Sequence, residues 1–451
     1  LRVWRRKKVV INRDKIVKTV IDIGNGKIKA ITGELSSNGE VLKVLRYIEG
    51  PSSGMIKNEI RDGESLSKSV NDVIERLRED TEQEIESVTI GISGESIKSR
   101  TVNMEYNFSE EEVTEEHIKA LLLEAEKKVL TPEEQIIKTE IYNMRVDNSG
   151  IVKNPLGILG SKLQGDVHLI YTDKKRVAKL VETINRISVD VENIVLNAYA
   201  SAKATLGEED KRMGVALADI GEGSTDIILY KNDKLIYTKT IPLGGMHFKS
   251  DLVYILKLAD ENDAIEILNK YREKDISPDG YIYYGEGKHI AALELEDFIN
   301  ARVEEIIDYI NDTIEKSGFN GYLGKGLVLT GGVISDKIIN TEKLLEKINK
   351  KTGYVARKVL PSEFSGLENV TTSMATAIGI FYEVMEEEDR KIRTGSYTHQ
   401  EIQVKNEKVV QLVSTEEELS KILEEELVEQ EKEKKEGGVV KAIKNWFSNF
   451  I

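Results

Sequence analysis

The strongest constraint on the fold of this chain is a short motif that occurs twice. Asp22-Ile23-Gly24-Asn25-Gly26 and Asp219-Ile220-Gly221-Glu222-Gly223 lie 197 residues apart. Each copy follows a run of apolar, largely β-branched residues and precedes another such run, a pattern typical of two strands joined by a tight glycine turn. Repetition of this unit at matched positions predicts two halves that are built alike.

Both motifs carry residue types that bind phosphate. Because glycine has no Cβ, consecutive backbone N–H groups of such a turn can approach a phosphate closely. The aspartate at the strand end, Asp22 or Asp219, can hold Mg²⁺ through water, since Mg²⁺ dehydrates reluctantly. Two facing turns would hold the β- and γ-phosphates of a nucleotide from both sides, and the Lys29 ammonium could reach the same phosphates.

A third glycine turn, Thr330-Gly331-Gly332-Val333, follows a buried strand later in the chain. A single Asp-x-Gly-x-Gly is more often an ordinary hairpin turn than a binding site, but two matched copies and a third turn favour a nucleotide site. We expect the third turn to approach the α-phosphate or the nucleoside. The residues predicted to contact the nucleotide are Gly24, Asn25, Gly26, Lys29, Gly221, Glu222, Gly223, Ser224, Thr225, Gly331, Gly332 and Val333.

Length, charge and cysteine content limit the other possibilities. The chain has 451 residues, more than one hydrophobic core usually holds, which predicts two or more domains. Its formal net charge of −15 argues against a general nucleic-acid binder, because phosphate binding needs a concentrated positive field. The absence of cysteine excludes disulfides and thiolate metal sites. No run of apolar residues approaches the ~20 that a membrane span needs, and we interpret the basic N-terminus as a cytoplasmic arm.

Several common catalytic motifs are missing. The chain has no Gly-x-x-x-x-Gly-Lys-Ser/Thr loop, which argues against a P-loop nucleotidase. Its five histidines are scattered, so the sequence does not indicate a histidine metal cluster. Ser93-Gly94-Glu95-Ser96 lacks the Gly-x-Ser-x-Gly elbow of serine hydrolases, and we predict an ordinary loop there.

The order of these motifs resembles the actin, Hsp70 and sugar-kinase superfamily. Within it, four segments resemble the FtsA family: Ile90-Gly91-Ile92-Ser93-Gly94, Asn154-Pro155-Leu156-Gly157, Val167-His168-Leu169-Ile170 and Ala375-Thr376-Ala377-Ile378-Gly379. The resemblance runs through most of residues 19–385 and returns at the C-terminus. It implies an α/β, two-lobed actin/Hsp70-like ATPase fold with an inserted FtsA-type subdomain and a C-terminal amphipathic helix, and ATP with Mg²⁺ in the cleft.

The resemblance also implies a division of the chain into segments. After an N-terminal arm at 1–18, we expect the core of the first lobe at 19–85 and 173–205, with the insert at 86–172 between its two parts. The core of the second lobe would follow at 206–245 and 326–371, with a subdomain of its own at 246–325. The chain would end with a closing helix at 372–385, a charged linker at 386–438 and the terminal helix at 439–451.

Four positions depart from the family's pattern. Where the family has three glycines this chain has Gly221-Glu222-Gly223, and where it has a threonine this chain has Lys249. Near the adenine the family offers a glutamate and a lysine, and this chain has Ile265 and Leu268. The water-positioning residue of the superfamily falls near Asn193, and an asparagine cannot act as a base. We therefore expect at most slow ATP hydrolysis, with the nucleotide acting as a switch.

The last thirteen residues form an amphipathic pattern. Their apolar residues fall on one helical face, and lysines flank it. A 13-residue helix is ~20 Å long, too short to span a bilayer, so it suits an in-plane interfacial helix. The alternative is a helix that docks on the protein's own core. The predicted membrane-facing residues are Val439, Val440, Ile443, Trp446, Phe447, Phe450 and Ile451.

The FtsA resemblance implies a function in cell division. Such a protein would tether the filament of a tubulin-like division GTPase to the cytoplasmic face of the cell membrane at the division site, and help to recruit later division proteins. Its partners would be the C-terminal tail of that GTPase, bound within 246–325, further copies of itself in a filament, and inner-membrane lipid. An actin-like pilus-assembly protein and a small-molecule kinase of the same superfamily remain alternatives.

Overall fold

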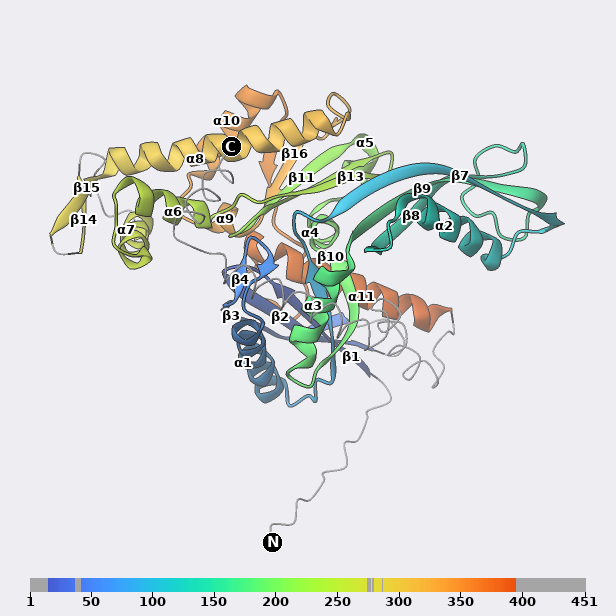
Figure 1. Cartoon of the computed structure of the whole chain (residues 1–451), viewed down its shortest axis with the longest axis horizontal. Helices are drawn as coiled ribbons and strands as arrows, with labels where there is room; N and C mark the ends of the chain where they lie inside the picture. Colours follow the sequence, from blue (N-terminus) through green and yellow to red (C-terminus); the bar gives the residue numbers. More distant parts are fainter. Residues whose placement is uncertain (1–14, 37–41, 274–276, 278–279, 286, 395–451) are drawn as a thin grey trace, which may run out of the picture.

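Two five-stranded sheets form the centre of the molecule (Figure 1). The computed structural model describes residues 15–36, 42–273, 277, 280–285 and 287–394. The first sheet has the order β10-β6-β1-β2-β3 and the second the order β13-β12-β11-β16-β17. Their strands are β1 (Lys15–Ile23), β2 (Lys27–Ser36), β3 (Leu42–Pro51), β6 (Ser87–Ile92), β10 (Asp190–Leu196), β11 (Val215–Ile220), β12 (Thr225–Lys231), β13 (Lys234–Ile241), β16 (Leu327–Thr330) and β17 (Ala356–Lys358).

Both sheets repeat one arrangement around a central strand. β1 pairs antiparallel with β2 and parallel with β6. β11 pairs antiparallel with β12 and parallel with β16 in the same way. The two central strands carry Asp22 and Asp219 as their penultimate residues, directly before the glycine turns. The prediction of two halves that are built alike is confirmed.

Helices cover both faces of the first sheet. α1 (Gly63–Thr81) and α3 (Lys174–Asn185) pack on one face, and α4 (Asn197–Thr205) and α11 (Ala375–Arg393) pack on the other. α1 begins after Asp62, whose carboxylate accepts hydrogen bonds from the N–H groups of Glu64 and Ser65. A short hairpin, β4 (Met55–Ile56) and β5 (Glu59–Ile60), precedes α1.

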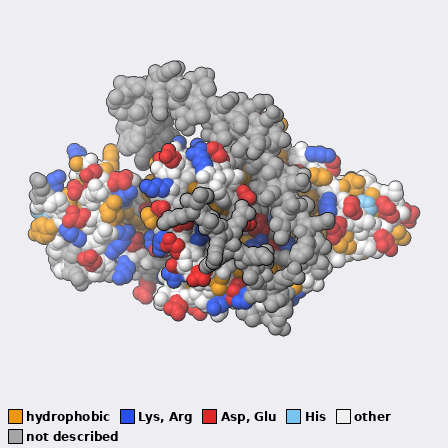
Figure 2. All heavy atoms as spheres, turned by 90° about the horizontal axis from the view of Figure 1, so that it is seen from below, with side chains coloured by type: hydrophobic (Ala, Val, Ile, Leu, Met, Phe, Trp, Pro, Cys, Tyr) orange, Lys and Arg blue, Asp and Glu red, His pale blue; other side chains and the backbone are white. Residues whose placement is uncertain are grey.

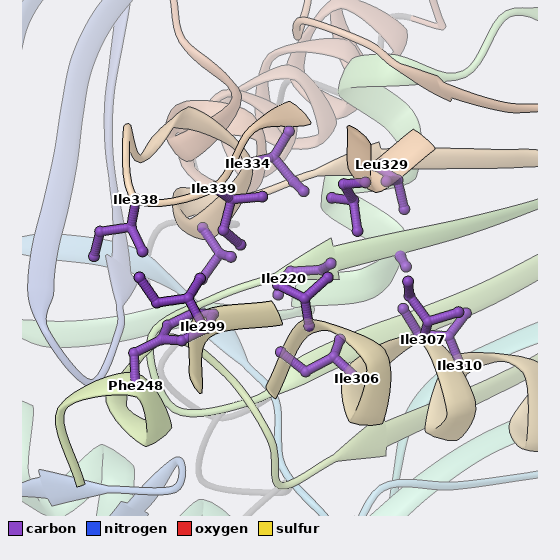
Figure 3. Close-up of a cluster of buried hydrophobic side chains, with 14 of the residues drawn as sticks. Ile220, Phe248, Ile299, Ile306, Ile307, Ile310, Leu329, Ile334, Ile338 and Ile339 are labelled. Atoms are coloured by element: carbon purple, nitrogen blue, oxygen red, sulfur yellow. The ribbon is translucent and has the colours of Figure 1, made fainter. Parts of the chain in front are cut away.

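The core of the second lobe lies between its sheet and one long helix. Figure 3 shows Ile220 and Leu329 of the sheet facing Ile306, Ile307 and Ile310 of α8 (Ala292–Lys316). The remaining elements of this lobe are α5 (Glu208–Met213), α6 (Met246–Ile255), α7 (Glu261–Glu273), the hairpin β14 (Tyr281–Tyr284) and β15 (Lys288–Ala291), α9 (Gly332–Ser335) and α10 (Thr341–Thr352).

A three-stranded sheet and one helix project to the side of the two lobes (Figure 1). The sheet has the order β7-β9-β8, with β7 (Lys98–Glu112), β8 (Glu134–Val146) and β9 (Leu159–Asp173), and α2 (Glu115–Val129) packs against it. This unit has a hydrophobic cluster of its own, which includes Leu121 of α2 and Leu163 of β9. It spans 98–173, whereas the predicted insert, 86–172, also includes β6 of the first sheet.

Strand β7 is absent from the segments that we predicted. The outer half of β7 consists largely of charged, exposed residues, so its composition alone does not indicate a strand. The signal was present in the alternation of Val102, Met104, Tyr106 and Phe108 with polar residues, which has the period of a half-buried strand.

The last described helix is longer than predicted. We expected it to end at residue 385, but after the 3₁₀ turn Thr372–Met374 the helix α11 continues to Arg393. Its added turns are stabilised by ion pairs four residues apart, Lys391 with Glu387 at 3.0 Å and Arg393 with Asp389 at 2.8 Å. The rest of the predicted linker, the terminal helix at 439–451 and residues 1–14 of the arm lie outside the described residues.

Within the described part of the chain, no helix is long and apolar enough to cross a bilayer. Figure 2 shows Lys and Arg side chains interspersed with Asp and Glu side chains over the visible described part of one face.

The crossing of α11 with α4 requires a glycine. A Cβ added to Gly379 would lie 1.8 Å from the backbone oxygen of Ala200. We predict that Gly379→Ala lowers the free energy of unfolding by about 1–3 kcal/mol or more, because two helix backbones must separate. Gly150→Ala is the matched control, since nothing lies within 4 Å of a Cβ there. Equal thermal unfolding midpoints for both variants would contradict this account of the helix pair.

Candidate functional site

The three glycine turns lie around one cavity between the two lobes. This cavity has a volume of about 490 Å³ and is lined from both sheets and from the segment after β16. The predicted residues that line it are Asp22, Gly24, Asn25, Gly26, Lys29, Asp219, Gly221, Glu222, Gly223, Ser224, Gly332 and Val333.

Three predicted residues do not line this cavity. Thr225 is fully buried, and its hydroxyl donates to the backbone oxygen of Leu243 at 2.8 Å. Gly331 lies behind the wall, with a φ of +100° and a hypothetical Cβ 2.4 Å from Oδ1 of Asp219. Its role is therefore to let the third turn approach that aspartate. The Asn193 side chain accepts a hydrogen bond from the next residue in β10.

The first two turns have matching backbone geometry. The N–H of Gly24 donates to the oxygen of Lys27 at 3.1 Å, and the N–H of Gly221 donates to the oxygen of Ser224 at 2.9 Å. Each turn therefore closes with the same hydrogen bond at the same position of its motif. The sequence repeat is thus also a repeat of the backbone hydrogen bond that shapes each turn.

The start of α6 fixes the orientation of the second turn. The N–H groups of Gly245 and Met246 donate to the oxygens of Gly221 and Glu222, at 3.0 and 2.7 Å. In a trans peptide the N–H points opposite to the carbonyl. The N–H groups of Glu222 and Gly223 are therefore directed away from α6 and are available to an anion in the cavity.

Three carboxylates are buried around one ammonium group. Asp22, Asp219 and Asp226 are each at least nine-tenths buried, and Lys29 lies 3.4 Å from Asp22. Burial raises the pKa of Asp219, although hydrogen bonds from Ser201 and Thr376 oppose the rise. Burial also raises the pKa of Asp226 to about 6. A cation bound beside these carboxylates would offset their charge.

The same carboxylates fit a magnesium ion that is held through water. No three His, Asp or Glu side chains among the described residues lie close enough together to ligate a metal directly. Mg²⁺ commonly keeps several waters and uses one or two carboxylates. Asp22 and Asp219, at the ends of the two central strands, are the residues that would hold such an ion.

Glu222 places a side chain where a third glycine would leave space. A Cβ on Gly26 would lie 3.1 Å from its Cγ, and a Cβ on Gly245 would lie 2.9 Å from its Oε2. Burial raises the pKa of this carboxyl, while the charges of Lys249 and Arg272 oppose the rise. The carboxyl group therefore reaches from the second turn towards the first and narrows the cavity.

Asn58 is a cavity residue that the sequence analysis missed. It occupies the tip of the β4–β5 hairpin with a φ of +63°. Its amide donates to the hydroxyls of Ser224 at 2.6 Å and Ser93 at 3.1 Å, and its backbone N–H donates to Oδ1 of Asn25 at 2.9 Å. Nδ2 of Asn25 also donates to Oδ1 of Asn58, so the Asn58 side chain connects the first and second glycine turns. An asparagine in a two-residue turn signals the hairpin but not these distant contacts.

The segment that begins at Ser93 is more than an ordinary loop, which corrects our prediction. The buried Ser93 hydroxyl donates to Asp226 of the second lobe at 2.5 Å, and Thr240 donates to the same oxygen at 2.6 Å. Arg176 of α3 donates to the backbone oxygens of Ser93 and Asn58 and pairs with Glu59 at 2.9 Å. The Ser93–Asp226 bond joins the two lobes, and the Arg176 contacts hold the Ser93 segment within the first lobe.

We predict that Asn58→Gly destabilises the protein without nucleotide by about 1–3 kcal/mol, because buried hydroxyl groups lose their donor. Glycine accepts the positive φ at this position, so the backbone is not the cause. Lys57→Gly is the control, because Lys57 also has a positive φ, of +51°, in the same turn. Glycine relieves backbone strain equally at both positions. If both variants unfold at the same denaturant concentration, the Asn58 side chain does not hold the two turns together.

Two family models match the chain. "SHS2 domain inserted in FTSA" matches residues 94–171, and "Cell division protein FtsA" matches residues 216–279. Among curated relatives, the cell division protein FtsA of Borreliella burgdorferi is 29% identical over 376 residues, which cover 80% of this chain and 89% of the relative. That of Escherichia coli is 28% identical over 333 residues, which cover 71% and 79%.

A solved structure shares the fold. The PilM-PilN type IV pilus biogenesis complex aligns with a TM-score of 0.58 at 15% identity, covering 82% of this chain and 99% of the other. The predicted α/β actin-like ATPase fold with an FtsA-type insert is confirmed by the family models and by this likeness.

Proposed function

The chain belongs to the FtsA family, and from this premise we propose that it is an actin-like cell division protein that binds ATP with Mg²⁺ between its two lobes and links a division filament to the membrane. Its membership of this family supports the cell division role. The observation that carries the nucleotide proposal is the convergence of three glycine turns on one cavity of about 490 Å³.

We assign the binding of the phosphates to backbone and side-chain groups of both lobes. The N–H groups of Glu222 and Gly223 would donate to one side of the phosphates, and the glycine turn at Gly24 would hold the other side. Lys29 would add a positive charge, and Asp22 and Asp219 would hold Mg²⁺ through water. The ion would offset the charge of the phosphates and of the carboxylates.

Nucleotide would act mainly as a conformational switch. The Asn193 side chain is turned to its own backbone and does not line the cavity, so it offers no base for hydrolysis. The cavity walls come from both lobes, so a bound nucleotide would bridge them and favour their closed arrangement. We propose slow hydrolysis at most.

We predict that Asp22→Asn and Asp219→Asn each weaken Mg²⁺-dependent ATP binding at least tenfold, or about 1.4 kcal/mol. Asparagine keeps the size of the side chain but removes the charge that would face the metal. Asp233→Asn, in the exposed β12–β13 turn, is the control. Calorimetric titration with MgATP provides the measurement. Unchanged affinity in both cavity variants would refute the assignment of the phosphate site.

We propose that the segment 439–451 attaches the protein to the cytoplasmic face of the membrane at the division site. Its apolar face, centred on Trp446 and Phe447, supports an interfacial helix. One short helix binds reversibly, so a filament that presents many of them would bind far more tightly, by ~10²–10⁴. The tail of the tubulin-like GTPase would bind within 246–325, and later division proteins would join this assembly. The predicted lobes, subdomains and linker are part of this proposal, with the closing helix extended to Arg393.

We predict that Trp446→Glu releases the protein from anionic liposomes and leaves ATP binding unchanged. The substitution places a charge in the apolar face, whereas the nucleotide cavity lies between the lobes. Liposome co-sedimentation and melting temperature are measured on the same variant, with Asn445→Glu as a control for added charge off that face. Retained sedimentation with a lowered melting temperature would instead support a helix that docks on the protein's own core.

A further inference from the structure

One end of the cavity between the lobes is walled by aliphatic side chains. The glycine turns occupy the phosphate end, and α7 and the segment after Gly332 form the other end. Leu268, Ile338 and Ile339 are buried there and belong to the hydrophobic core of the second lobe. Figure 3 shows Ile338 and Ile339 beside Ile299 and Phe248 of that core. We call this end, with its aliphatic wall, the base slot.

Ile265 forms the mouth of the base slot. It lies on α7 one turn before Leu268, lines the same cavity and is 41% exposed. A group that enters the slot along Ile265 therefore keeps one edge in water. The polar edge of a purine base could remain hydrated there while its faces contact aliphatic carbon.

The charged side chains at this end are already bound by other protein groups. Nε and Nη2 of Arg272 donate to the two carboxylate oxygens of Asp336 at 2.9 and 2.8 Å, and Nη1 donates to Asn269 at 2.7 Å. Oδ1 of Asp336 also accepts from the N–H of Ile338 at 3.0 Å. These bonds use three of the five N–H donors of Arg272 and both carboxylate oxygens of Asp336, so most of the hydrogen-bonding capacity of the pair is spent within the protein.

The two other polar side chains that line this end are also engaged. The Ser335 hydroxyl donates to the oxygen of Gly332 at 2.8 Å, and the Lys249 ammonium pairs with Glu261 at 2.6 Å. A base that entered the slot would meet apolar surface and polar groups that already have partners.

We propose that the base slot holds a purine through apolar contact and distinguishes adenine only weakly from guanine. This inference rests on the proposed nucleotide binding and names the class of ligand more closely, as purine nucleoside triphosphates. An apolar pocket discriminates against a polar isostere by a factor of only ~10². A site that hydrogen-bonds a group of its ligand discriminates against an analogue without that group by ~10⁴–10⁵. Hydration of the purine's polar edge beside Ile265 further lowers the discrimination between adenine and guanine.

The test titrates the full chain with MgATP, MgGTP, MgCTP and magnesium tripolyphosphate. We expect ATP and GTP affinities that differ by less than about thirtyfold, both tighter than CTP because the smaller base buries less apolar area. Tripolyphosphate should bind most weakly. A preference for ATP over GTP beyond about thirtyfold overturns the inference. Binding of tripolyphosphate as tight as that of ATP also overturns it, while leaving the phosphate site intact. Failure of every ligand to bind overturns the proposed function itself.

A variant at the mouth tests whether the base occupies this slot. Ile265→Ala should weaken ATP and GTP by the same factor, about three- to tenfold, and leave tripolyphosphate binding unchanged. The matched control is Leu293→Ala, because Leu293 is 52% exposed on α8 in the same lobe and does not line the cavity. Unchanged ATP and GTP affinities in Ile265→Ala, or a loss confined to one of them, would overturn the inference.

Discussion

The buried carboxylate of Asp226 holds the two lobes in register. It accepts one hydrogen bond from Ser93 of the first lobe and one from Thr240 of the second, at 2.5 and 2.6 Å. A buried carboxylate is costly unless hydrogen bonds replace its lost hydration. The lobes must therefore stay close enough for both hydroxyls to reach it. Asp226 also lines the cavity, so this contact fixes part of its wall from both lobes.

The cavity concentrates charge that the fold alone does not balance. Asp22, Asp219 and Asp226 are buried, the ammonium of Lys29 lies beside Asp22, and burial raises the pKa of Asp219 and Asp226. Such an arrangement favours a cation, and a cation in turn favours phosphate beside it. The acidic strand ends and the glycine turns are thus complementary parts of one site, because each supplies what the other lacks.

Different interactions dominate at the two ends of the cavity. At the phosphate end, fixed backbone N–H groups and carboxylates provide directional contacts, and the bonds from α6 to Gly221 and Glu222 keep the second turn oriented. At the base slot the wall is continuous with the second-lobe core, and its polar side chains are bound to one another. On the proposed function, binding at the first end would depend on charge, and at the second it would depend on buried apolar area.

The sequence by itself determined the repeated strand–turn–strand units and the three glycine turns, because these depend on local periodicity and on the lack of a Cβ. It also indicated which aspartates end the two central strands. Tertiary structure alone decided that Asn58 bridges both turns, that Ser93 binds Asp226, and that Gly331 lies behind the cavity wall rather than in it. Asn58 and Ser224 are separated by 166 residues, and Ser93 and Asp226 by 133. Contacts at such separations leave no periodic trace in the sequence, since only the packing of one lobe against the other brings their side chains together.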